Sequence, residues 1–198
     1  RLMKLLRIIL ASMIASMPAA MDAAAPEAVD PFELTIEENL LPPKTGNKQR
    51  EALRQRMNSV YNELSRLKFQ VSKSHDGLVV TASIPCSLIF APNDCSAIMP
   101  QAEELLKPFL GYANKTTDYK IVISVHSDDT GSDEYRYNIT EARANLICDY
   151  FESKVPQAAA AQTIIPYGLG HEAKLAEDDS IRNRSRNRRV EINIVPVK

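Results

Sequence analysis

A strand that leads through a polar turn into a helix is the feature that most restricts how this sequence can fold. Residues 119–125 place alternate apolar side chains on one face, which predicts a half-buried strand. A polar segment then turns at Gly131, and a helix is predicted over residues 139–153. Because such a strand and helix each bury one apolar face, the unit predicts helices packed on a sheet.

Strands and helices continue to alternate along the rest of the chain after residue 68. A turn at Gly77 lies between two strand-like runs, which predicts a hairpin over residues 69–83. Pro108 lies inside a helix predicted over residues 94–111, where a proline favours a kink or a break. Further strands are expected at 88–90, 163–167 and 189–197, and a further helix at 179–187. The predicted fold class is α+β, a β-α-β-α-β-type two-layer sandwich with a leading hairpin and an N-terminal helix.

The N-terminal part of the chain has the composition of a targeting segment. A basic head, an apolar run and then small residues up to Ala25 follow the order of a secretory signal. Residues 1–25 are therefore predicted to be a signal peptide, with an uncleaved membrane anchor as the alternative. Residues 26–46, rich in Pro, Glu, Ala and Thr, are predicted to be a flexible linker.

Residues 47–67 are predicted to form a helix without proline or glycine. Its apolar positions alternate in steps of four and three, the spacing of a coiled-coil seam. The seam consists of Leu53, Met57, Val60, Leu64 and Leu67. Two interpretations stay open: a homodimer through this helix, or an amphipathic helix lying against its own domain.

The composition excludes several classes of function. The formal net charge is −1, which provides no general attraction for nucleic acid. The arginine-rich segment 182–189 has no interleaved aromatic residue, so nucleic-acid binding is not expected. The 6 glycines form neither GxGxxG nor GxxxxGK[ST], so the sequence does not predict a nucleotide-phosphate cradle, and no cofactor is expected.

The chain has 3 cysteines, so at least one thiol has no partner within the chain. Cys86 and Cys95 are close enough in sequence for a disulfide across a loop, which is left open. Cys148 lies among apolar residues of a predicted helix and is expected to be a small core residue. There is no CxxC, so neither a structural zinc site nor a redox dithiol is predicted.

Asp128 and Arg143 are the candidate binding residues, one at the end of the strand and one on the following helix. A carboxylate accepts hydrogen bonds from an ammonium group, and a guanidinium binds a carboxylate through two parallel bonds. An amino-acid head group presents both of these partners on one carbon. The alternative is that the two residues pair with each other, which contributes only ~0–1 kcal/mol at a surface.

The residues around this pair resemble the OmpA C-terminal-like domain, a family of peptidoglycan-binding modules in outer-membrane proteins, peptidoglycan-associated lipoproteins and flagellar stator proteins. The resemblance extends over the predicted domain, residues 68–198. It is carried by Ser127-Asp128, Gly131, Asn138 and Arg143-Ala144, by the block Asn187 to Ile192, by Tyr167-Gly168, and by Leu88 to Phe90. Two departures are Val125, where the family has glycine, and Asn183-Arg184-Ser185, where it has Gly-Arg-Ala.

The resemblance implies a role for each matching residue. Asp128 is expected to bind the ammonium group of diaminopimelate in the peptide stem, and Arg143 its carboxylate. Asn138 is expected to brace the loop or contact the stem, and Thr130 and Gly131 to line the pocket. The supporting residues are expected to be Ser127, Arg184, Asn187 and Arg188.

The predicted function is a non-catalytic one: binding of peptidoglycan in the periplasm, tethering the cell envelope to the wall, with an outer-membrane partner. The first alternative is an envelope scaffold of the same fold that has lost its ligand and acts through protein partners. A remote alternative is a metal-dependent hydrolase using His126, Asp128 and His171. No fixed metal-ligand spacing such as HExxH supports the hydrolase.

Overall fold

The computed structural model describes residues 38–67 and 69–197. The predicted signal peptide, residues 1–25, and residues 26–37 of the predicted linker lie outside the described residues. Within the linker's described part, residues 38–40 are helical and residues 41–46 have no regular structure. In the described parts of the chain, none of the helices has the length and apolar character needed to cross a bilayer.

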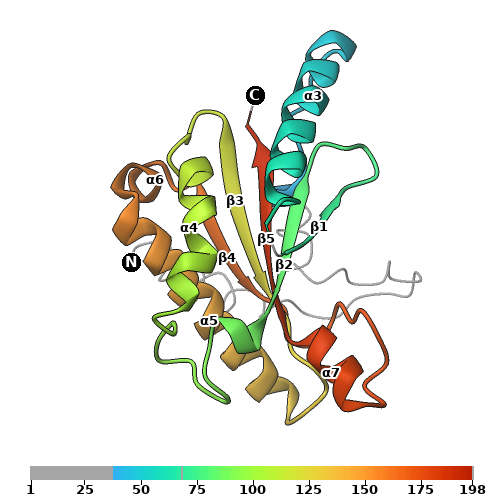
Figure 1. The fold of residues 1–198 in the computed structure, drawn as a ribbon, viewed down its shortest axis with the longest axis vertical. Helices are drawn as coiled ribbons and strands as arrows, with labels where there is room; N and C mark the ends of the chain where they lie inside the picture. The colour runs from blue at the N-terminus through green and yellow to red at the C-terminus, as the bar shows by residue number, and fades with distance from the viewer. Residues whose placement is uncertain (1–37, 68, 198) are drawn as a thin grey trace, which may run out of the picture. The chain divides into compact units, whose positions relative to one another are not determined.

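Five strands form one mixed sheet in the order β1-β2-β5-β3-β4 (Figure 1). All neighbouring pairs are antiparallel except β3 and β4, which are parallel. Strand β5, near the C-terminus, lies between β2 and β3, so the two halves of the sheet join only through it. The strands are β1 (Gln70–Lys73), β2 (Val80–Pro85), β3 (Tyr119–Val125), β4 (Ile164–Gly168) and β5 (Arg189–Pro196).

Three helices cover one face of this sheet, which confirms the predicted two-layer α+β fold. Their buried side chains belong to a single apolar cluster with alternate residues of β2, β3 and β5. They are α3 (Asn47–Leu64), α4 (Ala102–Ala113) and α5 (Asp133–Lys154), and two shorter helices are α6 (Pro156–Ala161) and α7 (Ile181–Asn187).

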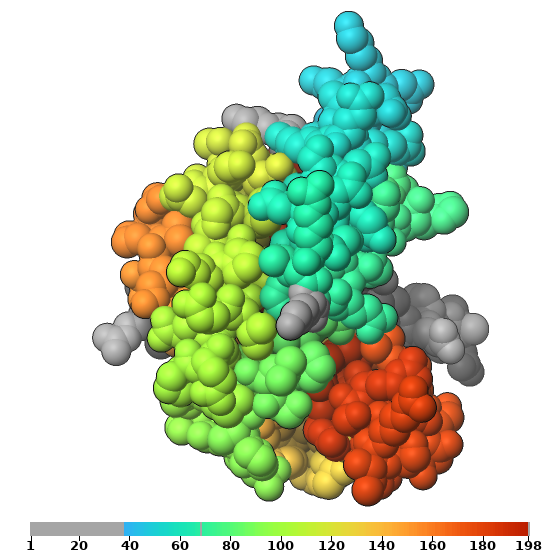
Figure 2. Space-filling view, viewed as in Figure 1, coloured from blue at the N-terminus to red at the C-terminus, as the bar shows by residue number. Residues whose placement is uncertain are grey.

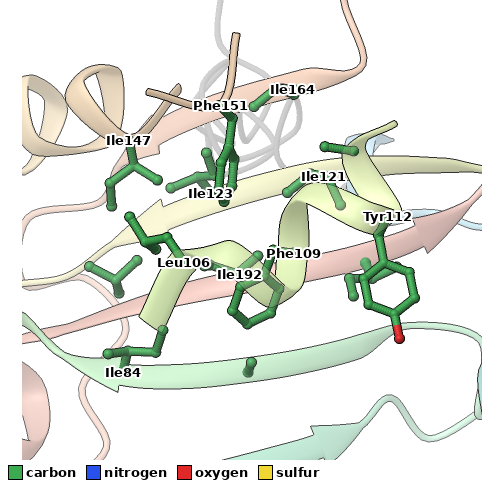
Figure 3. Close-up of a cluster of buried hydrophobic side chains, with 14 of the residues drawn as sticks. Ile84, Leu106, Phe109, Tyr112, Ile121, Ile123, Ile147, Phe151, Ile164 and Ile192 are labelled. Carbon is green, nitrogen blue, oxygen red and sulfur yellow. The ribbon is translucent and has the colours of Figure 1, made fainter. Parts of the chain in front are cut away.

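The centre of the core lies between α4 and the strands. In Figure 3, Leu106, Phe109 and Tyr112 of α4 lie over the sheet, with Ile123 and Ile192 on the strands beneath them. Leu106 and Phe109 are fully buried, and burial of each such side chain contributes about 1.5–3 kcal/mol. The core thus fixes the relative positions of the strand ends at which the candidate residues lie.

The opposite face of the sheet carries a smaller apolar cluster that includes Val122, Tyr167 and Val195. Leu40 packs against it, and Nδ2 of Asn39 lies 2.6 Å from the Tyr167 hydroxyl. Clusters on both faces explain why β3 is buried at nearly every position rather than at alternate ones.

Helix α3 packs against its own domain, which is the second of the two arrangements that the sequence left open. Leu53, Met57, Val60 and Leu64 are all buried, and the last three belong to the main core. Figure 2 shows α3 lying along the surface of the domain beside α4. Leu67, the fifth residue of the seam, lies beyond the end of α3 and is exposed. In this conformation the four buried positions are not available to a second copy of the chain, so the structure does not support a dimer through them.

Several predicted elements differ from the structure. Residues 88–90 are not a strand: a 3-10 helix covers Cys86–Leu88, and the N–H groups of Ile89 and Phe90 both bond to the Cys86 carbonyl. Helix α4 begins at Ala102 and continues through Pro108 without a break. Helix α5 begins at Asp133 rather than at 139, because Ser132 caps it by accepting a bond from the Tyr135 N–H at 3.2 Å. Helix α6 was not expected from the sequence.

Cys86 and Cys95 are free thiols, so the disulfide left open between them is absent. Cys86 is buried and Cys95 is exposed. Cys148 is buried in the main core, as expected.

Candidate functional site

A pocket of about 450 Å³ lies where β3 leads into α5. Its walls come from the turn after β3, the first half of α5, the segment between the 3-10 helix and α4, and the residue after α7. Five of the predicted site residues line it: Ser127, Asp128, Thr130, Arg143 and Arg188. The other four predicted residues, Gly131, Asn138, Arg184 and Asn187, are not among its lining residues.

Asp128 forms the acidic wall of the pocket and is only 4% exposed. Its Oδ1 atom accepts a hydrogen bond from the Thr130 N–H at 3.3 Å, and its Oδ2 atom pairs with Nη1 of Arg188. The sheet holds the residue in place, since the His126 N–H donates to the Arg189 carbonyl and the Ser127 N–H to the Gly170 carbonyl.

Arg143 forms a second, basic wall from α5 and is 8% exposed. Its Nε atom donates to the Asp94 carbonyl at 3.0 Å and its Nη2 atom to the Ala91 carbonyl at 3.5 Å. The guanidinium carbon lies 5.0 Å from the centre of the Phe90 ring. Both carbonyls are uncharged, and Arg143 forms no salt bridge among the described residues. Hydrogen bonds from Ser96, and to a smaller extent the charge of Arg143, lower the pKa of the exposed Asp94 carboxyl.

Asp128 and Arg143 therefore line the same pocket without pairing with each other in the described structure. The alternative of a simple surface pair is not what the structure shows. One carboxylate and one guanidinium, both largely buried, face the same cavity, and this arrangement fits a ligand that carries an ammonium group and a carboxylate.

Arg136 is a pocket residue that the sequence analysis missed. It is 8% exposed, and its Nη1 atom donates to the carbonyls of Asp129, at 2.7 Å, and Gly131. Its Nη2 atom pairs with the carboxylate of Asp133. The capping sequence Ser132-Asp133-Glu134 would have placed Arg136 in the first turn of α5, facing the turn before it.

Asn138 does not brace the turn, because α5 already includes it and turns its side chain to solvent. Bracing of the turn is carried out by Arg136, two residues earlier, and contact of Asn138 with the stem stays a prediction. Gly131 has φ +91°, and a Cβ there would lie 2.8 Å from the Tyr135 ring, so this turn requires glycine.

Asn187 and Arg184 act from behind the pocket by holding the loop between β4 and α7. Asn187 is fully buried, and its Oδ1 atom accepts from the N–H groups of Leu175 and Ala176. Its Nδ2 atom donates to Oδ1 of Asp178 at 2.8 Å, and Arg184 donates to the Asp178 carbonyl at 2.8 Å. The Oδ2 atom of Asp178 then accepts the Asp129 N–H at 3.2 Å, which connects the loop to the turn beside Asp128.

Val125, the departure at the family's glycine position, is fully buried in the main core and does not obstruct the pocket. The next residue, His126, lies on the opposite side of the strand, with its Nε2 atom 3.4 Å from Oε2 of Glu191. Burial lowers the pKa of His126, so it is neutral at neutral pH. Glu191 then has Arg189 as its charged partner, with Nε at 2.7 Å from Oε1.

The three residues of the hydrolase alternative do not converge on one point. His126 faces Glu191, Asp128 pairs with Arg188, and Nδ1 of His171 accepts a hydrogen bond from Arg136. Across residues 38–67 and 69–197, no group of three or more His, Cys, Asp or Glu side chains is arranged to hold a metal ion. The structure gives no support for the hydrolase.

Cys86 also lines the pocket, but its chemistry is that of a packed thiol. Burial raises its pKa to about 11, against the opposing charges of Arg143, Arg188 and Arg189. The thiolate, which is the nucleophilic form, is therefore scarce at neutral pH.

Sequence comparison identifies relatives for the part of the chain that builds this pocket. The model of the OmpA family matches residues 89–188. The peptidoglycan-binding protein ArfA of Mycobacterium tuberculosis is 29% identical over 100 residues, which cover 50% of this chain and 30% of that protein. The peptidoglycan-associated lipoprotein of Mesorhizobium japonicum is 32% identical over 101 residues, covering 51% of this chain and 58% of that protein. The chain thus spans between about a third and somewhat over half of these curated relatives.

Solved structures share the fold. A putative MotB-like protein from Desulfovibrio vulgaris superimposes with a TM-score of 0.59 at 21% identity, covering 75% of this chain and 99% of that one. The cell wall anchor of the T6SS from Pseudomonas aeruginosa gives a TM-score of 0.55 at 21% identity, covering 71% of this chain and 95% of that one. At this identity the likeness concerns the fold alone.

Proposed function

This chain belongs to the OmpA family, and we propose that it binds peptidoglycan without catalysis, through the diaminopimelate of the peptide stem. The observation that carries the proposal is the placement of Asp128 and Arg143 on the walls of one pocket, both nearly buried. Asp128 accepts hydrogen bonds from the ammonium group of the diaminopimelate side chain, and Arg143 binds the carboxylate on the same carbon. Two relatives, a peptidoglycan-binding protein and a peptidoglycan-associated lipoprotein, support this substrate class.

The free energy of this contact is expected to be modest. Two charge-assisted hydrogen-bonded contacts contribute ~1.5–3 kcal/mol each. Together these ~3–6 kcal/mol correspond to a dissociation constant between about 6 mM and about 40 μM for a single stem. A wall offers many stems, so retention on the polymer depends on repeated rebinding as well as on the single contact.

Binding of the wall would make the chain a periplasmic tether between the cell envelope and peptidoglycan, with an outer-membrane partner. The relatives that carry the matching segment include an outer membrane protein A, from Bordetella avium, and peptidoglycan-associated lipoproteins. A dimer through α3 is not part of the proposal, since Met57, Val60 and Leu64 are buried in the domain's own core.

The test is co-sedimentation of the purified full chain with isolated sacculi. Asp128→Asn keeps an acceptor for the Thr130 N–H but removes the charge, and Arg143→Gln keeps a hydrogen-bonding side chain without the charge. Both variants are expected to lose pelleting. Arg182→Gln, an exposed change of the same kind outside the pocket, is the control and should pellet like the unmodified chain.

The same experiment separates the scaffold alternative. Failure of the unmodified chain to pellet, with the chain folded by circular dichroism, would show that the fold has lost its ligand. Pelleting retained by both pocket variants would show binding elsewhere on the surface and overturn the proposed site.

A further inference from the structure

The charges that line the pocket do not balance for a simple zwitterion. Asp128 is its only acidic lining residue, whereas Arg136, Arg143 and Arg188 are all basic. Arg136 has its own carboxylate partner in Asp133. In the free protein Asp128 is neutralised by Arg188, which leaves Arg143 as the one pocket cation that forms no salt bridge among the described residues.

Arg188 occupies the position that a ligand's ammonium group needs. Its Nη1 atom pairs with Oδ2 of Asp128, while the other oxygen of that carboxylate is held by the Thr130 N–H. The two partners are held differently: the Asp128 side chain is 5% exposed and fixed by the turn, whereas the Arg188 side chain is 42% exposed. Arg188 is therefore the partner that is free to move.

We propose that Arg188 is an internal counter-ion that the ligand displaces from Asp128, and that the pocket consequently selects a stem ligand with two carboxylates for its one ammonium group. This inference rests on the proposed function and adds its charge selectivity. Once an ammonium group pairs with Asp128, two guanidinium groups face the ligand, those of Arg143 and Arg188. A second carboxylate of the ligand, beside the bound head group, then pairs with Arg188. Without this second carboxylate, Arg188 loses its pairing with Asp128 and gains no new partner.

Two small probes that differ by a single charge test this selectivity. The first is meso-diaminopimelate acetylated on one amine, which has one ammonium group and two carboxylates. The second is the same molecule with the carboxylate of the acetylated centre converted to an amide, which leaves one ammonium group and one carboxylate. Each is titrated into the full chain, and the dissociation constant is measured from NMR chemical-shift changes.

The unmodified chain should bind the two-carboxylate probe about tenfold more tightly, the size expected for one additional charge-assisted contact. Arg188→Gln should reduce that preference to near one, by weakening the two-carboxylate probe while leaving the amide probe equal or tighter. A tighter amide probe is expected because Asp128 no longer has an internal competitor.

Arg186→Gln is the matched control, since it removes the same charge from an exposed position of α7 outside the pocket lining. It should keep the full preference of the unmodified chain, which would show that the effect is local to Arg188. An equal loss of preference in both variants would assign the selectivity to the general field of α7 and overturn the proposal.

The remaining outcomes separate this inference from the proposed function. Binding of neither probe to the unmodified chain contradicts the proposed site itself. If the unmodified chain binds both probes equally and Asp128→Asn binds neither, the proposed site is supported but the role of Arg188 is overturned. An unchanged preference in Arg188→Gln also overturns it.

Discussion

The Nε atom of Arg136 donates a hydrogen bond to Nδ1 of His171 at 3.1 Å, which joins the first turn of α5 to the loop between β4 and α7. The same guanidinium holds the carbonyls of the turn that follows Asp128. One side chain thus connects the turn, the start of α5 that follows it, and a loop 35 residues away in the sequence. The position of the Asp128 carboxylate depends on all three.

Arg136→Gln is expected to lower the free energy of unfolding by about 2 kcal/mol, because the carbonyls of the turn lose the charged donor that the buried Arg136 supplies. Denaturation in urea measures this change. Amide hydrogen exchange should also become faster in residues 129–131 and around His171. A smaller fraction of the variant should pellet with sacculi.

The control for this change is Arg182→Gln, which removes an exposed guanidinium that makes no hydrogen bond or ion pair among the described residues. Its free energy of unfolding should stay within about 0.5 kcal/mol of the unmodified chain. If Arg136→Gln leaves both the stability and the hydrogen exchange of the turn unchanged, the contacts of Arg136 with the turn and His171 do not stabilise the fold.

Asn187→Ala is expected to cost about 2–4 kcal/mol in the free energy of unfolding. The change removes the acceptor of two backbone N–H groups, those of Leu175 and Ala176, and both bonds lie beside a fully buried side chain. Asn183→Ala on the same helix is the control, since its side chain bonds only to the exposed Asp179. Similar unfolding midpoints in urea for the two variants would contradict the assignment.

Glu191 makes the stability of the fold depend on pH in the acidic range. Burial alone would raise the pKa of its carboxyl, but the neighbouring His126 ring and the charge of Arg189 outweigh burial and lower the pKa from 4.5 to about 2. A carboxyl with a lowered folded-state pKa stabilises the fold above its unfolded pKa. That contribution is lost as the pH falls from about 4.5 to about 2.

Glu191→Gln should therefore flatten the pH dependence of unfolding in that window by up to about 3 kcal/mol, at 1.4 kcal/mol per pKa unit. The remaining slope comes from other carboxyls with lowered pKa values, such as Asp178, where hydrogen bonds from Asn187 and Lys174 outweigh the opposing effect of burial. Glu152→Gln, which removes a carboxylate that forms no ion pair among the described residues, is the variant for comparison. Urea unfolding at a series of pH values measures both variants.

The strands and the two principal site residues were predictable because their signals are local. Strand β3 and the hairpin have apolar runs bounded by turn residues, and Asp128 and Arg143 lie within one strand-turn-helix unit. The bracing of the turn by Arg136 rather than Asn138 was not predicted, because the sequence placed the start of α5 at residue 139. A tyrosine- and charge-rich first turn gives no apolar period, so only the cap at Ser132 marks it.

The partners of the site residues were harder to predict because they are distant in sequence. Arg188 reaches Asp128 only because β5 pairs with β3, and this pairing depends on the order of strands in the sheet. Residues 88–90 are apolar like a strand, yet two N–H groups bond back to the Cys86 carbonyl. An apolar run of three residues does not distinguish a buried turn from a strand.

The last strand-to-helix contact can be tested with a pair of glycines. A Cβ on Gly168, at the end of β4, would lie 2.1 Å from the backbone nitrogen of Glu141 in α5, so neither side can yield without moving the helix. Gly168→Ala should lower the free energy of unfolding by about 3 kcal/mol. Gly111 in α4 has nothing within 4 Å of the same position, and Gly111→Ala should raise it by about 0.5–1 kcal/mol.

Because Arg143 lies on the same helix as Glu141, the displacement forced by Gly168→Ala should also disturb the pocket. Pelleting with sacculi should weaken in Gly168→Ala and stay unchanged in Gly111→Ala, with both measured at a temperature where each variant is folded. A Gly168→Ala variant that matches the unmodified chain in stability and pelleting would contradict the close approach of β4 and α5. Opposite shifts of the two unfolding midpoints would instead show that α5, and the guanidinium it carries, are positioned by the absence of a side chain at Gly168.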